Sequence, residues 1–504
     1  MQAYVCESAV AESGEAFAMA RQRFAALLEW MAAGPALGMT RGEVEERAFV
    51  EGTEVLRLVM QGHVDARAAG EERLREVADA DGRRRGCAEP GRGRVLTTRF
   101  GDVVVERIAY PARGRSRLHP ADAVANLPEE THSHGLRRLA AVEATRGSFG
   151  EATAAVERAT GVRVGKRQVE QLTVRAAADV DAFYAARAPV VGMGDGTALV
   201  LTFDAKGVVM RPDALREPTA RAAASRKLAG RLSRGEKRCR KRMAEVAGVY
   251  DCPPVPRTVD DILPADGQRA ADRPAPRAAG KWLTASVTDD TATVIAAGFA
   301  EAARRDPDHT RDWVALVDGN THQIDRIRVE ARARKVEVTV IIDFIHVCEY
   351  LWKAAWCFFD EGDPKTEQWV RAQARQVLSG RAGIVAAAIR RKATYRGLDP
   401  AQRKGADEAA TYLLNKKRHL DYPTALASGW PIATGVIEGA CRHLVKDRMD
   451  ITGARWGLES AEAVAKLRAL IANGDLDAYW TYHIHQEQQR IHNTRYKGAV
   501  IPTR

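Results

Sequence analysis

Three apolar runs of this chain each lead into an aspartate, a side chain that could take part in metal-dependent chemistry. The runs are TALVLTFDAKG (197–207), WVALVDGN (313–320) and VEVTVIIDFIH (336–346), which carry Asp204, Asp318 and Asp343. Continuous Val, Leu and Ile predict strands buried on both faces of an α/β sheet. A strand that ends in Asp places its carboxylate at the C-terminal edge of such a sheet, where α/β proteins have their binding and active sites. Mg²⁺ prefers oxygen ligands, and two ions about 4 Å apart can activate an attacking oxygen and stabilise a leaving one.

A further acid, Glu438, stands among small residues in GVIEGACRHLVKDRMDITGARW (435–456). By itself it would be half of an i,i+4 pair with Arg442 on a helix. Because two strand-end aspartates are also present, Glu438 is better explained as the third carboxylate of a metal site. It would be carried by a helix that packs next to the strands. Bases that would neutralise phosphates near such a site follow it: Arg442, His443, Lys446, Arg448 and Arg455. Trp456 is either a core aromatic or a ring that stacks on a flipped or frayed base.

The elements that must position these acids alternate between strand and helix. Helical patterns at 291–305 and 321–335 separate and follow the apolar runs, and residues 349–428 carry only helical signals. A helix is predicted over 457–475, with Gly474 near its end as a C-cap. These patterns predict a mixed α/β core that is interrupted by a long all-helical insertion.

The N-terminal half has the patterns of a nucleic-acid-binding region. Residues 95–114 alternate as a β-hairpin around a Gly-Asp turn. Residues 148–178 predict a helix, a turn at Gly161 and a second helix opened by Lys166 and Arg167, the layout of a helix-turn-helix or of an ordinary αα-hairpin. Residues 221–242 contain ten Lys/Arg and one acid. This run is either a solvated helix or loop, or a segment that follows the phosphate backbone of a nucleic acid. Its last bases are Arg238, Arg240, Lys241 and Arg242.

The bulk composition agrees with a reduced, soluble protein that has an anionic partner. The formal net charge is +11, which favours nucleic acid. Seven scattered cysteines, none in a CxxC pair, argue against a disulfide framework and an ordinary zinc finger. The segment MQAYVCESAVAESGEAF lacks a basic region followed by an apolar core, and no apolar run is long enough for a membrane span. We therefore expect neither a signal peptide nor a membrane anchor.

Long phrases in the second half resemble the IS-Kra family of bacterial insertion-sequence transposases. The similarity runs from about residue 50 to the C-terminus and is densest over 311–482, where GVIEGACRHLVKDRM and TGARWGLESAEA are unusual and specific. The family is similar in layout to Mutator-like enzymes, which have a DDE triad on an RNase H-like fold. The resemblance implies a triad of Asp204, Asp318 and Glu438, separated by 114 and 120 residues. Asp343 and His346 match the C/D-x-x-H motif that lies near the active site of that wider group, or form a buried Asp–His hydrogen bond.

The resemblance also implies the activity and its requirements. We expect metal-dependent DNA cleavage and strand transfer with two Mg²⁺ ions, for which Mn²⁺ can substitute. Asp204, Asp318 and Glu438 would hold the metal, and His346 would orient a phosphate or a leaving group. The expected partners are terminal inverted repeats, target DNA and further copies of the chain in a synaptic complex. The expected location is the bacterial cytoplasm, in association with the nucleoid.

The resemblance and the patterns together give a division of the chain. We expect a mostly helical N-terminal DNA-binding region ahead of a mixed α+β, RNase H-like core with its insertion. The expected parts are a helical region with a basic linker (1–94), the hairpin and helix-turn-helix region (95–190), the first part of the core (191–348), the helical insertion (349–428), the last part of the core with the Glu-bearing helix (429–475) and a basic aromatic tail (476–504).

Several alternatives stay open at the level of the sequence. Asp195 competes with Asp204 as the first acid, and Asp343 competes with Asp318 as the second metal ligand. Asp318 could instead cap the helix that begins near Thr321. Other functions compatible with the chain are a non-transposing nuclease, a catalytically inactive DNA-binding protein derived from a transposase, and a zinc hydrolase that uses Asp343 and His346.

Overall fold

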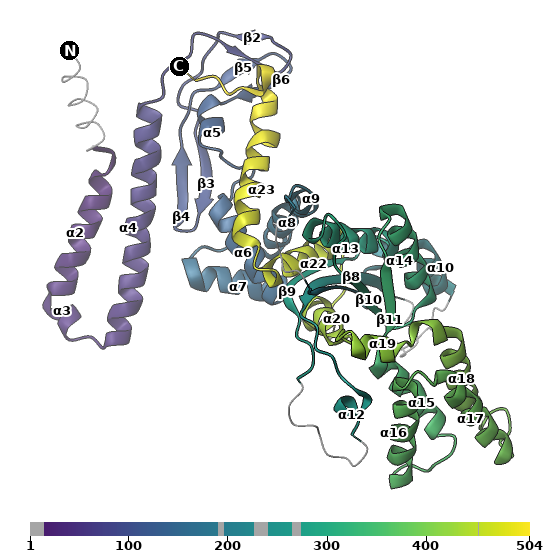
Figure 1. Ribbon diagram of the computed structural model, residues 1–504. Helices are drawn as coiled ribbons and strands as arrows, with labels where there is room; N and C mark the ends of the chain where they lie inside the picture. The colour runs from purple at the N-terminus through teal and green to yellow at the C-terminus, as the bar shows by residue number, and fades with distance from the viewer. Residues whose placement is uncertain (1–14, 190–195, 226–239, 265–273, 452, 504) are drawn as a thin grey trace. The chain divides into compact units, whose positions relative to one another are not determined.

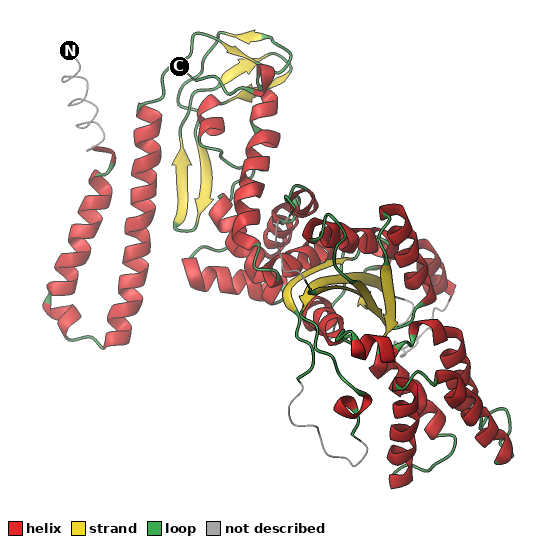
Figure 2. Ribbon diagram, in the orientation of Figure 1, coloured by secondary structure: helices red, strands yellow, loops and turns green. Residues whose placement is uncertain are grey.

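The computed structural model describes residues 15–189, 196–225, 240–264, 274–451 and 453–503, and divides into two compact units. Unit 1 comprises Met1–Ala185 with Asp475–Arg504, and unit 2 comprises Ala186–Gly474. Both helices and strands contribute to each unit (Figure 2), which confirms the mixed α and β class. Among the described residues, no helix combines the length and the apolarity that crossing a membrane requires.

Unit 2 is built on a sheet that has, in the described residues, the strand order β11-β10-β7-β8-β9. β7, β8 and β9 form an antiparallel meander, whereas β10 and β11 run parallel to β7. β10 is buried along its whole length, as the continuous apolar run predicts. The strands are β7 (Ala198–Val209), β8 (Lys241–Cys252), β9 (Ala279–Ser286), β10 (Trp313–Val317) and β11 (Val338–Ile342).

Helices pack on both faces of this sheet (Figure 1). α13 (Thr291–Arg305) lies so close to β7 that a Cβ on Gly298 would meet the Phe203 ring at 2.8 Å. Because neighbouring strand residues point to opposite faces, Asp204 points away from α13. α20 (Gly435–Ala440) and the π-helical segment Cys441–Lys446 pack against β7. The remaining helices of the core are α10 (Glu217–Ser225), α12 (Val259–Ile262), α14 (Thr321–Arg334), α21 (Asp447–Met449) and α22 (Leu458–Ala472).

Residues 349–428, expected to be a helical insertion, contain helices and no strand. The side chains of this insertion share one apolar cluster with the sheet, in which Leu316 of β10 and Leu413 of the insertion are both fully buried. The insertion is therefore packed onto the core as an integral part of it. Its helices are α15 (Phe344–Ala355), α16 (Pro364–Leu378), α17 (Ala382–Tyr395), α18 (Lys404–Lys416) and α19 (Tyr422–Ala427).

Unit 1 contains the predicted hairpin and the predicted helix-turn-helix layout. β3 and β4 pair from Arg94↔Val105 to Thr98↔Gly101, so Gly101 begins the second strand instead of forming the turn. Gly161 ends α7 in the left-handed conformation, with φ +70°. The elements are α2 (Ala18–Ala32), α3 (Gly34–Leu37), α4 (Arg41–Ala69), β1 (Val77–Ala78), β2 (Arg84–Arg85), β3 (Arg94–Thr98), β4 (Gly101–Val105), β5 (Tyr110–Ala112), β6 (Arg115–Leu118), α5 (Pro120–Val124), α6 (His134–Arg146), α7 (Phe149–Thr160), α8 (Lys166–Ala176), α9 (Val180–Ala185) and α23 (Leu476–Ile491).

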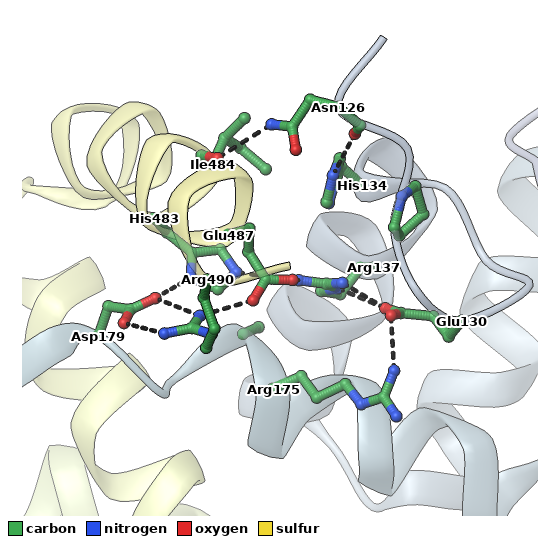
Figure 3. A network of polar contacts seen from close by, with 12 residues as sticks. Asn126, Glu130, His134, Arg137, Arg175, Asp179, His483, Ile484, Glu487 and Arg490 are labelled. Carbon is green, nitrogen blue, oxygen red and sulfur yellow. Dashed lines mark hydrogen bonds and ion pairs between the residues drawn. The ribbon is translucent and has the colours of Figure 1, made fainter. Parts of the chain in front are cut away.

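A buried ionic network joins the C-terminal helix α23 to the N-terminal part of unit 1 (Figure 3). Arg137 is fully buried and donates to Glu130 (2.7 Å), to Glu487 (2.6 Å) and to Nε2 of His483 (3.1 Å). The other ring nitrogen of His483 lies 2.7 Å from the Asp179 carboxylate. Residues from both ends of the chain thus share one set of buried charges, and each charge has a partner of opposite sign.

Candidate active site

Asp204 lies on β7, and Asp318 directly follows β10, the adjacent parallel strand of unit 2. β10 pairs with β7 from Trp313↔Leu199 to Leu316↔Thr202. The same register, carried two residues further, sets Asp318 level with Asp204. Both residues are half-buried. They are therefore partly accessible to solvent at the edge of the sheet where β10 ends.

The structure corrects one expectation about Asp204, which lies in the middle of its strand and not at its end. β7 continues to Val209 because β8 pairs with it along its whole length, as far as Val209↔Lys241. β10 stops earlier, so only the first half of β7 has a parallel neighbour. Asp204 therefore still lies at the C-terminal edge of the parallel part of the sheet.

Glu438 is carried by α20, which packs on β7 and β8. Three residues later, the buried thiol of Cys441 has a side-chain hydrogen bond with Asp204. Burial raises the pKa of Cys441, and the charge of Asp204 and this hydrogen bond raise it further. Because residues three apart share one helix face, Glu438 lies about one turn from the contact with Asp204. Its own side chain is exposed.

Asp343 ties the helix of Glu438 to the parallel strands. Its carboxylate caps α15 by accepting from the amide of Ile345 (2.9 Å), and it also accepts from the hydroxyl of Thr434, the residue before α20. Its own amide donates to the carbonyl of Val317 at the end of β10 (2.8 Å). Burial raises the pKa of Asp343, and the hydrogen bonds from Thr434 and Ile345 oppose that rise. With both carboxylate oxygens bonded to protein donors, Asp343 is placed to position α20.

His346 lies one turn into α15 within a small aromatic group. Its Nδ1 is 3.3 Å from the carboxylate of Glu349, and its ring meets Tyr350 and Tyr412 edge-on at 5.6 and 6.1 Å between ring centroids. Tyr412 comes from α18 of the insertion, and its hydroxyl donates to the carbonyl of Asp318 (3.1 Å). Tyr412 was not predicted as a site residue, because the helical periodicity of its segment does not reveal which loop its side chain contacts.

Gly319, in the loop that follows Asp318, allows this contact with Tyr412 of the insertion. Gly319 follows Asp318 with φ +95°, and a Cβ there would meet the Tyr412 hydroxyl at 2.9 Å. Lys416, one turn further along α18, donates to the hydroxyl of Thr321 at the start of α14 (2.7 Å). The insertion therefore supports the site from the side of β10.

The bases that follow Glu438 separate into an exposed and a buried set. Arg448 and Trp456 are each only 4% exposed, with the guanidinium 4.6 Å from the ring centroid. The indole of Trp456 donates to the carbonyl of Met449 (3.0 Å), and its backbone bridges to Met210 at the end of β7. In this structure Arg448 and Trp456 are buried, which is the core alternative left open for Trp456, whereas Arg448 was expected to contact phosphate. The exposed set is Arg442, His443, Lys446 and Arg455.

The other predicted DNA contacts lie away from these acids along the chain. Lys166 and Arg167 are exposed in the first turn of α8, in unit 1. In unit 2, Lys241 begins β8 and lies 3.6 Å from Asp450, and Arg242 donates to the carbonyl of Val287 (2.6 Å). Arg240 is half-buried just ahead of β8. Asp195 and Arg238 lie outside the residues that the structure describes.

The donor set of this site suits a hard divalent cation. Asp204, Asp318 and Glu438 offer only carboxylate oxygens, the ligands that Mg²⁺ and Mn²⁺ prefer. In the described part of the chain, however, no three His, Cys, Asp or Glu side chains are gathered closely enough to hold a metal ion. The exposed side chain of Glu438 can change rotamer, whereas the backbone of Asp204 is held within β7 and the carbonyl of Asp318 is held by Tyr412. The chain matches no protein-family model and no curated protein.

Proposed function

We propose that this chain is a DNA transposase of a bacterial insertion sequence, with a DDE triad on an RNase H-like core. The observation that carries the proposal is the strand order. Numbered along the chain within unit 2, the sheet of the described residues reads 3-2-1-4-5, with an antiparallel meander followed by two parallel strands. That order is the one expected for an RNase H-like fold, and it agrees with the IS-Kra resemblance of the sequence.

The placement of the acids supports the same function. Asp204 on β7 is level with Asp318, which directly follows the neighbouring strand β10, and Glu438 lies on the helix that packs on β7. When two Mg²⁺ or Mn²⁺ ions are bound, they supply activation of the attacking oxygen and stabilisation of the leaving one. The two aspartates would hold these ions from the sheet, and Glu438 would complete the ligand set from its helix.

The surrounding residues have parts in the same reaction. The exposed bases Arg442, His443 and Lys446 follow Glu438 and would neutralise strand phosphates beside the acids. His346, held beside Tyr412, would orient a phosphate or a leaving group. In unit 1, Lys166 and Arg167 open α8 as the bases of a helix-turn-helix that reads the terminal inverted repeats. The protein would act on DNA in the bacterial cytoplasm.

Strand transfer on the DNA that flanks the gene tests this proposal. With Mg²⁺ and those DNA ends, the wild-type chain should cut and then join the 3′-hydroxyl to target DNA, and Asp318→Asn should lose at least about two orders of magnitude in rate. Asp325→Asn is the matched control, because Asp325 is an exposed acid on the adjacent helix α14. Full activity in Asp204→Asn, Asp318→Asn and Glu438→Gln would overturn the assignment. Cleavage without joined products would favour the nuclease, and tight DNA binding without cleavage would favour the inactive DNA-binding protein.

A further inference from the structure

The helical hairpin formed by α2 and α4 in unit 1 has polar contacts on its inner side. Arg47 lies over the ring of Trp30, with 4.6 Å to the centroid, and Arg23 pairs with Glu51. The described residues of α2 include one buried side chain, Ala20, and those of the 29-residue helix α4 include one buried position, Gly62. Such a hairpin has almost no apolar core of its own.

Large apolar side chains of the same two helices face solvent. Phe24 and Leu28 of α2 are 50% and 52% exposed, and Phe49 and Leu56 of α4 are 46% and 48% exposed. Other exposed apolar residues of this segment are Met19, Met31, Leu37, Met39, Val50 and Val59. Several large apolar side chains exposed on two neighbouring helices indicate an interaction site.

The spacing of these residues is that of helix packing. On α2, Phe24, Leu28 and Met31 follow one another at intervals of four and three residues. On α4, Leu56 is seven residues after Phe49, and Val59 is three residues further on. Intervals of three, four and seven produce the narrow apolar stripe of a coiled coil or helix bundle. The partner that this stripe fits is therefore another helix or pair of helices.

The second half of α4 already has a partner within unit 1. Gln61 exchanges hydrogen bonds with the backbone of Val104 on β4 (2.8 and 2.9 Å), and Arg57 donates to the carbonyl of Asp102. The first half of α4, from Arg41 to Leu56, runs beside α2, and Figure 1 shows this part of the hairpin extending past the end of the β3–β4 pair. The exposed stripe thus lies on the part of the hairpin that projects from the rest of the unit.

We propose that the α2–α4 hairpin pairs with the same hairpin of a second copy of this chain to form a four-helix bundle. The two stripes complement each other when α2 of one copy lies parallel to α4 of the other. Leu28 then lies opposite Gly52, which leaves room for it, and Phe49 and Leu56 lie opposite the small side chains of Ala25 and Ala32. A two-fold axis repeats the same contact on the other side and closes the assembly.

The mass of the full chain in solution, without DNA or metal, tests this inference independently of any catalytic activity. Light scattering after size exclusion should give a dimer at micromolar concentration. Phe49→Gln combined with Leu56→Gln should raise the dissociation constant roughly 30-fold or more, the scale of interface hot spots, while the helix content by circular dichroism stays unchanged. Ile384→Gln is the matched control, because Ile384 is 64% exposed on α17 of unit 2.

A size exchange tests the pairing itself. Gly52→Leu should weaken the dimer, because the new side chain meets Leu28 of the other copy and nothing in its own chain, and Leu28→Ala together with Gly52→Leu should restore it. A wild-type chain that stays monomeric over the whole concentration range would overturn the inference and would mean that another part of the same chain covers the stripe. A dimer that is unaffected by Phe49→Gln with Leu56→Gln would also overturn it, by placing the contact elsewhere.

Discussion

Asp343 and Asp318 follow neighbouring strands, and replacement of each by Asn should give opposite results. Asp343 caps α15 and accepts a hydrogen bond from Thr434. Asn is as good an N-cap as Asp: its side-chain oxygen can accept from the Ile345 amide, and its side-chain nitrogen can donate to the hydroxyl oxygen of Thr434. We therefore expect Asp343→Asn to fold and to keep most of its DNA cleavage. Asp318→Asn removes a proposed metal ligand and should abolish cleavage while it folds normally.

The loss of stability expected when Asp343 is removed follows from the contacts that its side chain makes. Asp343→Ala removes the N-cap, at a cost of about 0.5–2 kcal/mol. It also leaves the buried hydroxyl of Thr434 without its acceptor, which costs about 1–3 kcal/mol. The sum is about 1.5–5 kcal/mol of stability, and α20 loses one of its attachments to the parallel strands. Cleavage by Asp343→Ala should fall through the misplacement of Glu438, and Asp343→Asn should restore it.

Two measurements decide between positioning and ligation. Urea unfolding gives the stability of each variant, and cleavage over a range of Mg²⁺ concentrations gives the apparent affinity for the metal. A positioning residue predicts an unchanged Mg²⁺ dependence in Asp343→Asn. If Asp343→Asn unfolds like the wild type and yet is as inactive as Asp318→Asn, Asp343 is a metal ligand and the reasoning is wrong.

Three further predictions address other parts of the chain. Burial alone would raise the pKa of Asp179, but hydrogen bonds from His483 and Arg490 lower it to about 2. Asp179→Asn should therefore cost at most about 2 kcal/mol, less where solvent screens the charges; since the depressed pKa stabilises the fold above about pH 4, this deficit should disappear as the pH falls through 2 in urea titrations. A deficit that is constant with pH would contradict this. Trp456→Ala should lower stability by about 3–5 kcal/mol in thermal unfolding, and a selective loss of DNA affinity at unchanged stability would instead place the ring on DNA. Tyr412→Phe should cost about 1 kcal/mol and slow cleavage without weaker DNA binding, whereas an unchanged rate would remove Tyr412 from the site.

The sequence predicts those elements of unit 2 whose patterns are local. β10 and β11 are continuous apolar runs, so their burial can be recognised without knowledge of their neighbours. The strandless insertion follows from helical periodicity alone. β8 and β9 were missed because their residues mix charge with small and apolar types. β8 begins with Lys241 and Arg242, which continue the basic run before it. The pairing of β8 with β7, and not its composition, makes it a strand.

Contacts between distant segments could not be predicted in this way. Tyr412 lies 94 residues from Asp318, and Arg137 lies 346 residues from His483. Neither pair has a spacing that helix or strand geometry would produce. The sequence left open whether Trp456 is a core aromatic, and the burial of Arg448 could not be predicted for a related reason. Their segment pairs with Met210 at the end of β7, which covers the ring and places the guanidinium against it.

The way in which the insertion is attached explains how Glu438 can stay near the sheet after 120 residues of intervening chain. The insertion leaves the sheet at Phe344, whose amide donates to the carbonyl of Ile432 (2.8 Å), and Asp343 bonds Thr434 two residues later. Its two ends are therefore fastened to each other at the end of β11. The cost of closing such a loop grows only slowly with its length, so the number of residues between the fastened ends has little influence on where α20 begins. The position of Glu438 depends on Asp343 and Thr434, and a change in the length of the insertion between its helices should leave the three acids in place.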